Sequence, residues 1–394
     1  MPVSRTPGAR RLAGRSSLRS RRRIVIAIGA VVLLAVATVG GFVLAGDSSS
    51  PKVASAPLTT AAAAESPTDS PTPSATPTSA EPSVSVPPPA PSHSVDSEPP
   101  PVVTRTIPAV SGTVGVTTVT YIDTTRTTPP RGDSDEQPSR TLNVTIRYPV
   151  ANAGGDGEID NAPVRPGNYP LLVFAHGFNV SADTYAALER EVALAGFIVA
   201  APDFPMSSSA LPGEADESDL GNQAGDVSFV ISSLLDPAAV PQLLAGHISG
   251  GQVGVFGHSD GGVTAAAAAY NSSAYDSRIG AAAILSGGEE AYPGGWFTAG
   301  IPPLLTVQGT DDGINPYSDG VEIYYDDPGT PKYLVDVNGG GHLPPFTTDD
   351  IRPAISVLIS DFFAAYLKHD AAALARIPGD ASVDILSLAG IELP

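Results

Sequence analysis

From residue 105 onward, short apolar runs alternate with longer stretches of helical periodicity, and this alternation limits the possible folds more than any other feature. The apolar runs have the length of buried parallel strands: residues 171–175, 197–201, 253–256, 281–285, 304–307 and 333–337. The helical segments are residues 181–195, 222–235, 261–270 and 350–368. Such alternation predicts an α/β fold with a mostly parallel sheet covered on both faces. Residues 114–123 and 142–148 predict two antiparallel strands at its start.

The sequence before this region predicts a membrane anchor. Residues 24–46 contain no charged residue, and a helix of that length spans about 34 Å, compared with roughly 30 Å for a hydrocarbon core. Residues 1–23 carry eight arginines and no acid, and such basic flanks stay in the cytoplasm. We therefore expect a single-pass protein with a cytoplasmic N-terminus. The alternative is a cleaved signal peptide, which would leave the protein secreted.

Residues 47–104 are predicted to form a disordered linker. Fourteen of these 58 residues are proline, interleaved with serine, threonine and alanine, and large apolar side chains are almost absent. Such a segment cannot bury enough apolar surface to offset its ordering entropy. We therefore expect a spacer that holds one folded domain, residues 105–394, away from the membrane.

Composition excludes several classes of site and partner. The chain has no cysteine, which rules out disulfides, a thiol nucleophile and metal sites built on thiolates. Of its 21 basic residues, eight are the N-terminal arginines, which leaves 13 against 41 acidic residues. So negative a surface repels phosphate backbones, and nucleic acid is not an expected partner. No motif implies a metal or an organic cofactor.

The strongest chemical signal is the pentapeptide GHSDG at residues 257–261, which has the pattern G-x-S-x-G. It lies between the strand predicted at 253–256 and an alanine-rich helix. A strand-to-helix turn this tight needs small residues on both sides, and it lifts the serine hydroxyl above the sheet. The helix N-terminus beside the serine favours a developing negative charge. We interpret Ser259 as a nucleophile.

Such a nucleophile needs an acid and a histidine, which follow it in that order. The loop after the strand at 304–307 offers two adjacent acids, Asp311 and Asp312, and spacing leaves both open. After the strand at 333–337, three glycines precede His342. The other five histidines lie in the linker, beside the serine, in another motif or at surface positions, so His342 is the predicted general base.

A second motif, FAHGFN at residues 174–179, follows the strand at 171–175. Acyl transfer needs two backbone N–H donors that face the oxyanion of the tetrahedral intermediate. One comes from the residue after the nucleophile and one from a loop of this kind. Asp260 and Phe178 are the predicted pair.

Together these motifs resemble the α/β-hydrolase superfamily over residues 105–368. Within it, the sequence is most similar to the branch of dienelactone-hydrolase-like proteins, chlorophyllases, platelet-activating-factor acetylhydrolases and cutinase-like polyester hydrolases. The segments that carry the resemblance are RYP at 147–149, AHGF at 175–178, APD at 201–203, the Ser259 pentapeptide, GTDD at 309–312 and GH at 341–342. In such relatives the acid lies three residues beyond the loop glycine, which implies Asp312. Dienelactone hydrolases proper use a cysteine nucleophile, so the resemblance does not imply that activity.

The segment between the strands at 281–285 and 304–307 is too short for a helical cap, which predicts an open site. An open site suits bulky, lipid-like or polymeric esters. Tyr292 and Trp296 in this segment are candidate substrate contacts, although packing against the domain is the alternative role. The RGD tripeptide at 131–133 is interpreted as a charged surface turn.

The sequence thus predicts that residues 105–394 form a catalytic domain outside the cell. Its predicted function is that of a serine carboxylic-ester hydrolase, with Ser259, His342 and Asp312 working through an acyl-enzyme. An acyltransferase, an amidase or a peptidase would use the same machinery. A catalytically silent binding module displayed on a stalk is a further alternative, and the sequence leaves the oligomeric state open.

Overall fold

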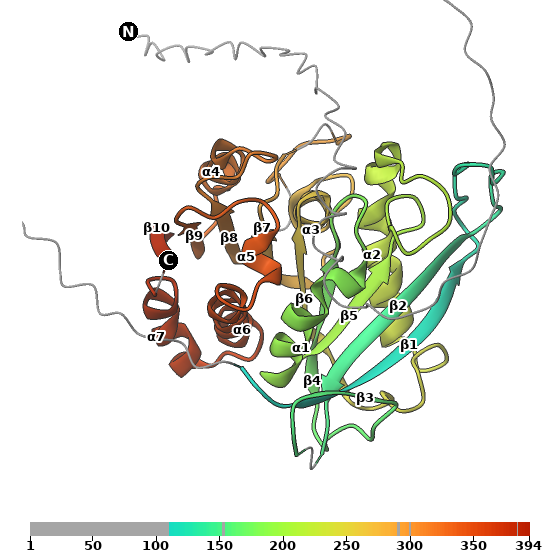
Figure 1. Ribbon diagram of the computed structural model, residues 1–394, viewed down its shortest axis with the longest axis horizontal. Coiled ribbons are helices and arrows are strands. Elements are labelled where there is room, and N and C mark those ends of the chain that lie inside the picture. Colours follow the sequence, from blue (N-terminus) through green and yellow to red (C-terminus); the bar gives the residue numbers. More distant parts are fainter. Residues whose placement is uncertain (1–109, 152–153, 290–291, 299–300, 384) are drawn as a thin grey trace, which may run out of the picture. The chain divides into compact units, whose positions relative to one another are not determined.

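The described part of the protein is built on one mixed β-sheet with helices on both faces (Figure 1). This computed structural model describes residues 110–151, 154–289, 292–298, 301–383 and 385–394. The strands are β1 (Thr113–Asp123), β2 (Arg140–Pro149), β3 (Gly157–Asp160), β4 (Tyr169–Ala175), β5 (Ile198–Asp203), β6 (Ile248–His258), β7 (Ile279–Leu285), β8 (Leu304–Gly309), β9 (Lys332–Val337) and β10 (Leu386–Glu392). The helices are α1 (Ala186–Leu194), α2 (Leu220–Leu235), α3 (Asp260–Tyr270), α4 (Tyr317–Asp326), α5 (Pro344–Thr347), α6 (Arg352–Leu367) and α7 (Ala371–Asp380).

The order of strands across the sheet is β10-β9-β8-β7-β6-β4-β5-β2-β1-β3. Strands β4 to β9 pair in parallel, whereas β2 pairs antiparallel with both β1 and β5, and β10 pairs antiparallel with β9. The chain reverses its direction of travel across the sheet at β4, because β5 lies on one side of β4 and β6 on the other. In open α/β sheets, ligands bind at the carboxyl ends of the strands at such a reversal.

Alternating side chains of the central strands pack into two cores, one on each face of the sheet. On β4, Leu172 and Phe174 belong to the buried cluster that includes residues of α1, α6 and α7, whereas Leu171 and Val173 belong to the cluster that includes residues of α2 and α3. Helix α3 is buried along its whole length after Asp260. Its run of five alanines, residues 265–269, keeps the side chains small enough for a helix to lie this deep against the sheet.

The predicted α/β architecture is confirmed, with each predicted strand and helix present within a few residues of its expected position. Two 3₁₀ turns, η3 (Ala182–Tyr185) and η4 (Glu217–Asp219), lead into α1 and α2. The sequence did not predict β3, α4, α5, α7 or β10. The C-terminal segment, which had no predicted place, forms α7 against α6 and then β10 at the edge of the sheet.

The predicted anchor at residues 24–46 and the predicted linker at 47–104 lie outside the described residues, so both stay predictions. Among the residues that the structure does describe, no helix is long and apolar enough to cross a bilayer.

A buried ionic cluster joins the antiparallel start of the sheet to α2. The guanidinium of Arg140 on β2 donates to the carboxylates of Asp219 and Asp226 at 2.6–3.1 Å, and all three side chains are fully buried. Arg126 bonds Asp226 from the other side. Each carboxylate is therefore held in the interior by an arginine, and the cluster fixes where α2 lies against β2.

We expect Arg140→Leu to lower the free energy of unfolding by about 3–5 kcal/mol, because two buried carboxylates lose their main counter-ion. The matched control is Arg376→Leu. Arg376 makes a similar two-bond contact with Asp361 but is 45% exposed, so its loss should cost less than about 1 kcal/mol. Urea unfolding of the two variants measures both values. Equal losses would contradict a stabilising role for the buried cluster.

Candidate active site

Ser259 occupies the turn between β6 and α3 that the pentapeptide predicts. Its backbone has φ 59° and ψ −125°, a conformation that is strained for a residue with a side chain and that is found preferentially at functional sites. The residues two positions before and after it must be glycine for steric reasons. A Cβ on Gly257 would lie 2.1 Å from the carbonyl oxygen of Gly261, and one on Gly261 would lie 2.0 Å from that of Ala175. The turn is therefore closed by backbone contacts that no larger residue allows.

The structure brings Ser259, His342 and Asp312 into one hydrogen-bonded chain. The Oγ of Ser259 lies 2.8 Å from Nε2 of His342, and Nδ1 of His342 lies 2.8 Å from Oδ2 of Asp312. An ionised carboxylate only accepts, so Nδ1 carries the proton and Nε2 is free to accept the serine proton. His342 is 11% exposed and Asp312 is fully buried, so a substrate can reach the imidazole but not the acid.

Asp312, rather than Asp311, contacts the histidine. Burial favours the neutral form of Asp312, but the bond from His342 and the N–H groups of Ile314 and Asn315 outweigh it. Together they lower the pKa of this carboxyl below its usual range. The side chain of Asp311 is exposed, and its backbone N–H donates to Gly340 in the loop that leads to His342.

The loop after β4 lies against the serine, as the second motif predicts. A Cβ added to Gly177 would stand 3.1 Å from that of Ser259. Phe178, the next residue, is half-buried, and Asp260 is the first residue of α3, where backbone N–H groups have no partner within the helix. The two predicted oxyanion donors therefore lie on the two segments that border Ser259.

His176 in this loop is a structural residue. It is fully buried, its Nδ1 donates to the carbonyl of Gly177 at 2.8 Å, and its Nε2 accepts from the N–H of Phe204 at 3.1 Å. Burial lowers the pKa of His176, which keeps the ring neutral and suited to both bonds. A second hydrogen bond joins this loop to the segment after β5, from the N–H of Asn179 to the carbonyl of Ser207. The loop after β4, which carries the predicted oxyanion donor Phe178, is thus fastened to the segment that follows β5.

The RGD tripeptide forms an exposed turn at Gly132 and Asp133, as predicted, but the side chain of Arg131 is not on the surface. Its side chain is buried, and its guanidinium donates to five backbone carbonyls, those of Pro205, Ser208, Leu211, Gly213 and Glu214. A segment rich in turns presents several carbonyls without partners, and one guanidinium can satisfy them together. Arg131 therefore holds the segment to which the oxyanion loop is fastened.

Tyr292 and Trp296 are half-buried and pack against the core on the α2 and α3 face. Their rings meet at 5.7 Å, and the Tyr292 hydroxyl donates to the carbonyl of Leu220 at 2.6 Å. This is the packing role that the sequence left open, and their contact with substrate stays a prediction. No group of residues suited to a metal ion occurs in the described part of the chain.

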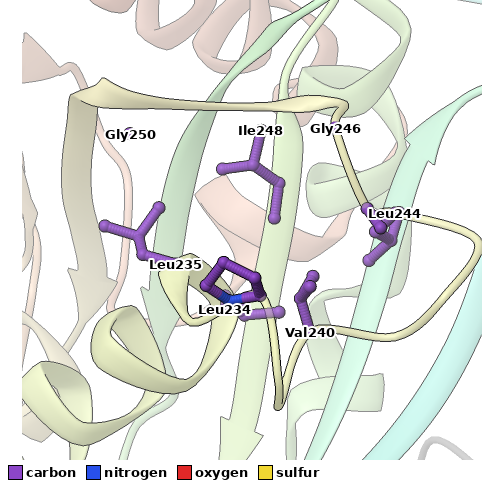
Figure 2. A pocket seen from close by; sticks show the side chains of 9 residues that line it. Leu234, Leu235, Val240, Leu244, Gly246, Ile248 and Gly250 are labelled. Atoms are coloured by element: carbon purple, nitrogen blue, oxygen red, sulfur yellow. The ribbon is translucent and has the colours of Figure 1, made fainter.

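A cavity of about 330 Å³ lies away from this site (Figure 2). It is lined by Leu234, Leu235, Val240, Leu244 and Ile248, which come from the end of α2, the segment after it and the start of β6. Ser259 follows the last residue of β6, so the length of that strand separates the cavity from the serine.

Comparison with known proteins gives two matches. Residues 158–286 match the family model of chlorophyllase, and this segment includes the oxyanion loop and Ser259 but ends before Asp312 and His342. No curated protein matches the sequence. Among solved structures, the ferulic acid esterase from Streptomyces cinnamoneus is similar, with 22% identity and a TM-score of 0.54 over 70% of this chain and 96% of that chain.

The structural match shows a shared fold, and the family model supports a hydrolase of the esterase type. These findings confirm the resemblance at the level of fold and general class: residues 158–286 are similar to the chlorophyllase family, and the chain has the fold of an esterase.

Proposed function

We propose that the protein is a serine carboxylic-ester hydrolase that works through an acyl-enzyme intermediate. The observation that carries the proposal is the chain of hydrogen bonds from Ser259 through His342 to Asp312, which leaves Nε2 of the imidazole facing the serine hydroxyl. This arrangement activates a hydroxyl that is otherwise a weak nucleophile. The match to the chlorophyllase family model supports an ester as the bond that is cleaved.

In the proposed reaction, Ser259 Oγ attacks the ester carbonyl carbon while its proton passes to Nε2 of His342. The carbonyl oxygen becomes an oxyanion, which the N–H groups of Phe178 and Asp260 would stabilise. The tetrahedral intermediate then collapses, the C–O bond to the alcohol breaks, and His342 returns the proton to the leaving oxygen. Water repeats the sequence on the acyl-enzyme and releases the acid, while Asp312 stabilises the charged imidazole in both halves.

We further propose that the substrate is bulky, lipid-like or polymeric. The described residues between β7 and β8 form no helix, so no helical cap from this segment covers the serine. An accessible nucleophile can reach an ester bond that is part of a larger surface. No cofactor takes part in this mechanism.

Ser259→Ala should reduce the hydrolysis of p-nitrophenyl esters by about 10⁶-fold, because the acyl-enzyme cannot form. The assay is a ladder of esters from acetate to palmitate, and the chain length with the highest kcat/KM separates an esterase from a lipase. Matched amide substrates serve as the comparison that would reveal an amidase. Ester hydrolysis that persists in a folded Ser259→Ala protein would refute the assignment.

Asp312→Asn should lower kcat by on the order of 10⁴-fold, because an amide in this position no longer holds the imidazole tautomer that accepts the serine proton. The neighbouring Asp311→Asn is the matched control. The Asp311 side chain is exposed, so kcat should stay within about twofold of wild type. Steady-state kinetics on one p-nitrophenyl ester decide between the acids, and the reverse pattern would assign the role to Asp311.

We also propose that residues 24–46 anchor the protein in the membrane with the catalytic domain outside the cell. Protease added to intact cells should then digest the domain, while the N-terminal segment stays with the membrane fraction after an alkaline wash. A domain that is protected until the cells are lysed would contradict this topology. A domain found only in the medium, without residues 24–46, would identify a cleaved signal peptide.

A further inference from the structure

We propose that His258 is a positioning residue that holds the oxyanion loop and the loop of the general base in place on either side of Ser259. The inference rests on the proposed function, since it assigns a role within the same site. The evidence is a set of hydrogen bonds that joins Tyr185, His258 and His342, together with the packing of Tyr185 against Gly177. The nucleophile is the residue that follows His258.

The first contact fixes the tautomer of His258. Its Nε2 lies 2.8 Å from the backbone carbonyl oxygen of His342. A carbonyl oxygen only accepts, so Nε2 of His258 carries the proton and donates it. The buried ring thereby holds the backbone of the general base through a bond to its main chain, and it leaves the imidazole of His342 free for Ser259 and Asp312.

The second contact uses the other ring nitrogen. Nδ1 of His258 lies 2.7 Å from the hydroxyl of Tyr185, so in the neutral ring this nitrogen accepts and the tyrosine donates. The tyrosine hydroxyl also lies against the loop after β4, because a Cβ added to Gly177 would stand 3.3 Å from it. The donors therefore follow one direction, from Tyr185 to His258 to His342. One end of the set is Tyr185, which packs against the residue before Phe178, and the other end is the backbone of His342.

Packing holds the ring of His258 in this orientation. His258 is 1% exposed. The centroid of its ring lies 4.6 Å from that of the His342 imidazole and 4.7 Å from that of the Phe346 ring on α5. The titratable groups around it are His342, Asp312 and Tyr185. Burial, followed by the nearby His342, lowers the pKa of His258 to about 3. The ring therefore stays neutral at every pH at which the enzyme would work, and it adds no charge beside the base.

These bonds matter for catalysis because of where His258 lies in the chain. It is the last residue of β6, and its backbone continues directly into the strained turn at Ser259. The backbone of His258 is paired with Leu285 on β7, so a shift of the loop of His342 would stretch its bond to His258, and a shift of the loop after β4 would disturb its packing on Tyr185. Because misplacement of reacting groups by about 1 Å can cost 10²-fold in rate, this restraint acts on catalysis rather than on substrate binding.

The test compares two substitutions of His258 in the full-length protein. His258→Phe keeps a ring to pack against His342 and Phe346 but removes both nitrogens, whereas His258→Gln keeps an N–H that can reach the carbonyl of His342. We expect His258→Phe to lower kcat by about 10- to 100-fold with KM changed less than about threefold. His258→Gln should restore kcat to within about threefold of wild type.

Two tyrosine variants provide a second test of the proposal and its control. Tyr185→Phe removes the donor to His258 and should also lower kcat more than KM. The matched control is Tyr148→Phe on β2, which removes a buried hydroxyl that donates to the carbonyl of Ala162 and should leave kcat unchanged. The proposal is overturned if His258→Phe keeps wild-type kcat. It is also overturned if the Phe and Gln variants of His258 lose kcat and thermal stability equally, because packing alone would then explain the loss.

A spectroscopic readout separates failure of this inference from failure of the proposed function. If the wild-type protein hydrolyses no ester and its serine does not react with an activated phosphonate, the proposed function is wrong. Nitrogen NMR of isotope-labelled histidine still tests the inference, because the chain has six histidines and His258→Gln identifies one signal. A neutral ring protonated at Nε2 from about pH 5 to 8 supports the assignment. A His258 that titrates in that range overturns it.

Discussion

The contact between three backbone segments at Ser259 is the constraint on which the rest of the site depends. The end of β4, the end of β6 and the start of α3 approach so closely that Gly257 and Gly261 have no room for a Cβ. The first turn of α3 carries Gly261 and Gly262 at this contact, and the alanines at 265–269 let the rest of the helix lie directly against the sheet. The strained backbone of Ser259 is the result, and burial of the elements around it offsets the cost of the strain.

The other functional groups reach the serine from separate loops, and buried polar contacts hold each loop. Gln308 and the backbone after Asp312 orient the acid, whereas His176 and Arg131 fasten the oxyanion loop and the segment next to it. Buried polar groups of this kind are costly unless every partner is present, so the contacts define a single arrangement more than they add stability. The loops of the site are therefore held by hydrogen bonds from buried neutral histidines and from the buried guanidinium of Arg131, and not by apolar packing alone.

Much of this could be predicted from the sequence, because the signals are local. The apolar runs and the G-x-S-x-G turn fix the strands, α3 and the place of Ser259, and the order of the loops identifies His342 and two adjacent acids. Spacing could not choose between Asp311 and Asp312, since the choice depends on which side chain turns inward. The contact between Tyr185 and His258 joins residues 73 positions apart, and no periodicity reports it. Helix α7 was missed because it is short and contains Pro378, and β3 because it has only four residues, most of them exposed.

The last strand has a consequence for self-association. β10 covers the outer edge of β9, and the side chain of Asn338, directly after β9, donates to the carbonyl of Ile385 just before β10. If these final residues were lost, β9 would present unpaired N–H and C=O groups along its length, and such an edge is a template for strands of other chains. The same strand leads into the glycine loop of His342. β10 therefore covers an edge close to the point where the chain turns toward His342, and loss of β10 is expected to expose that edge to aggregation and to disturb the loop of His342 together.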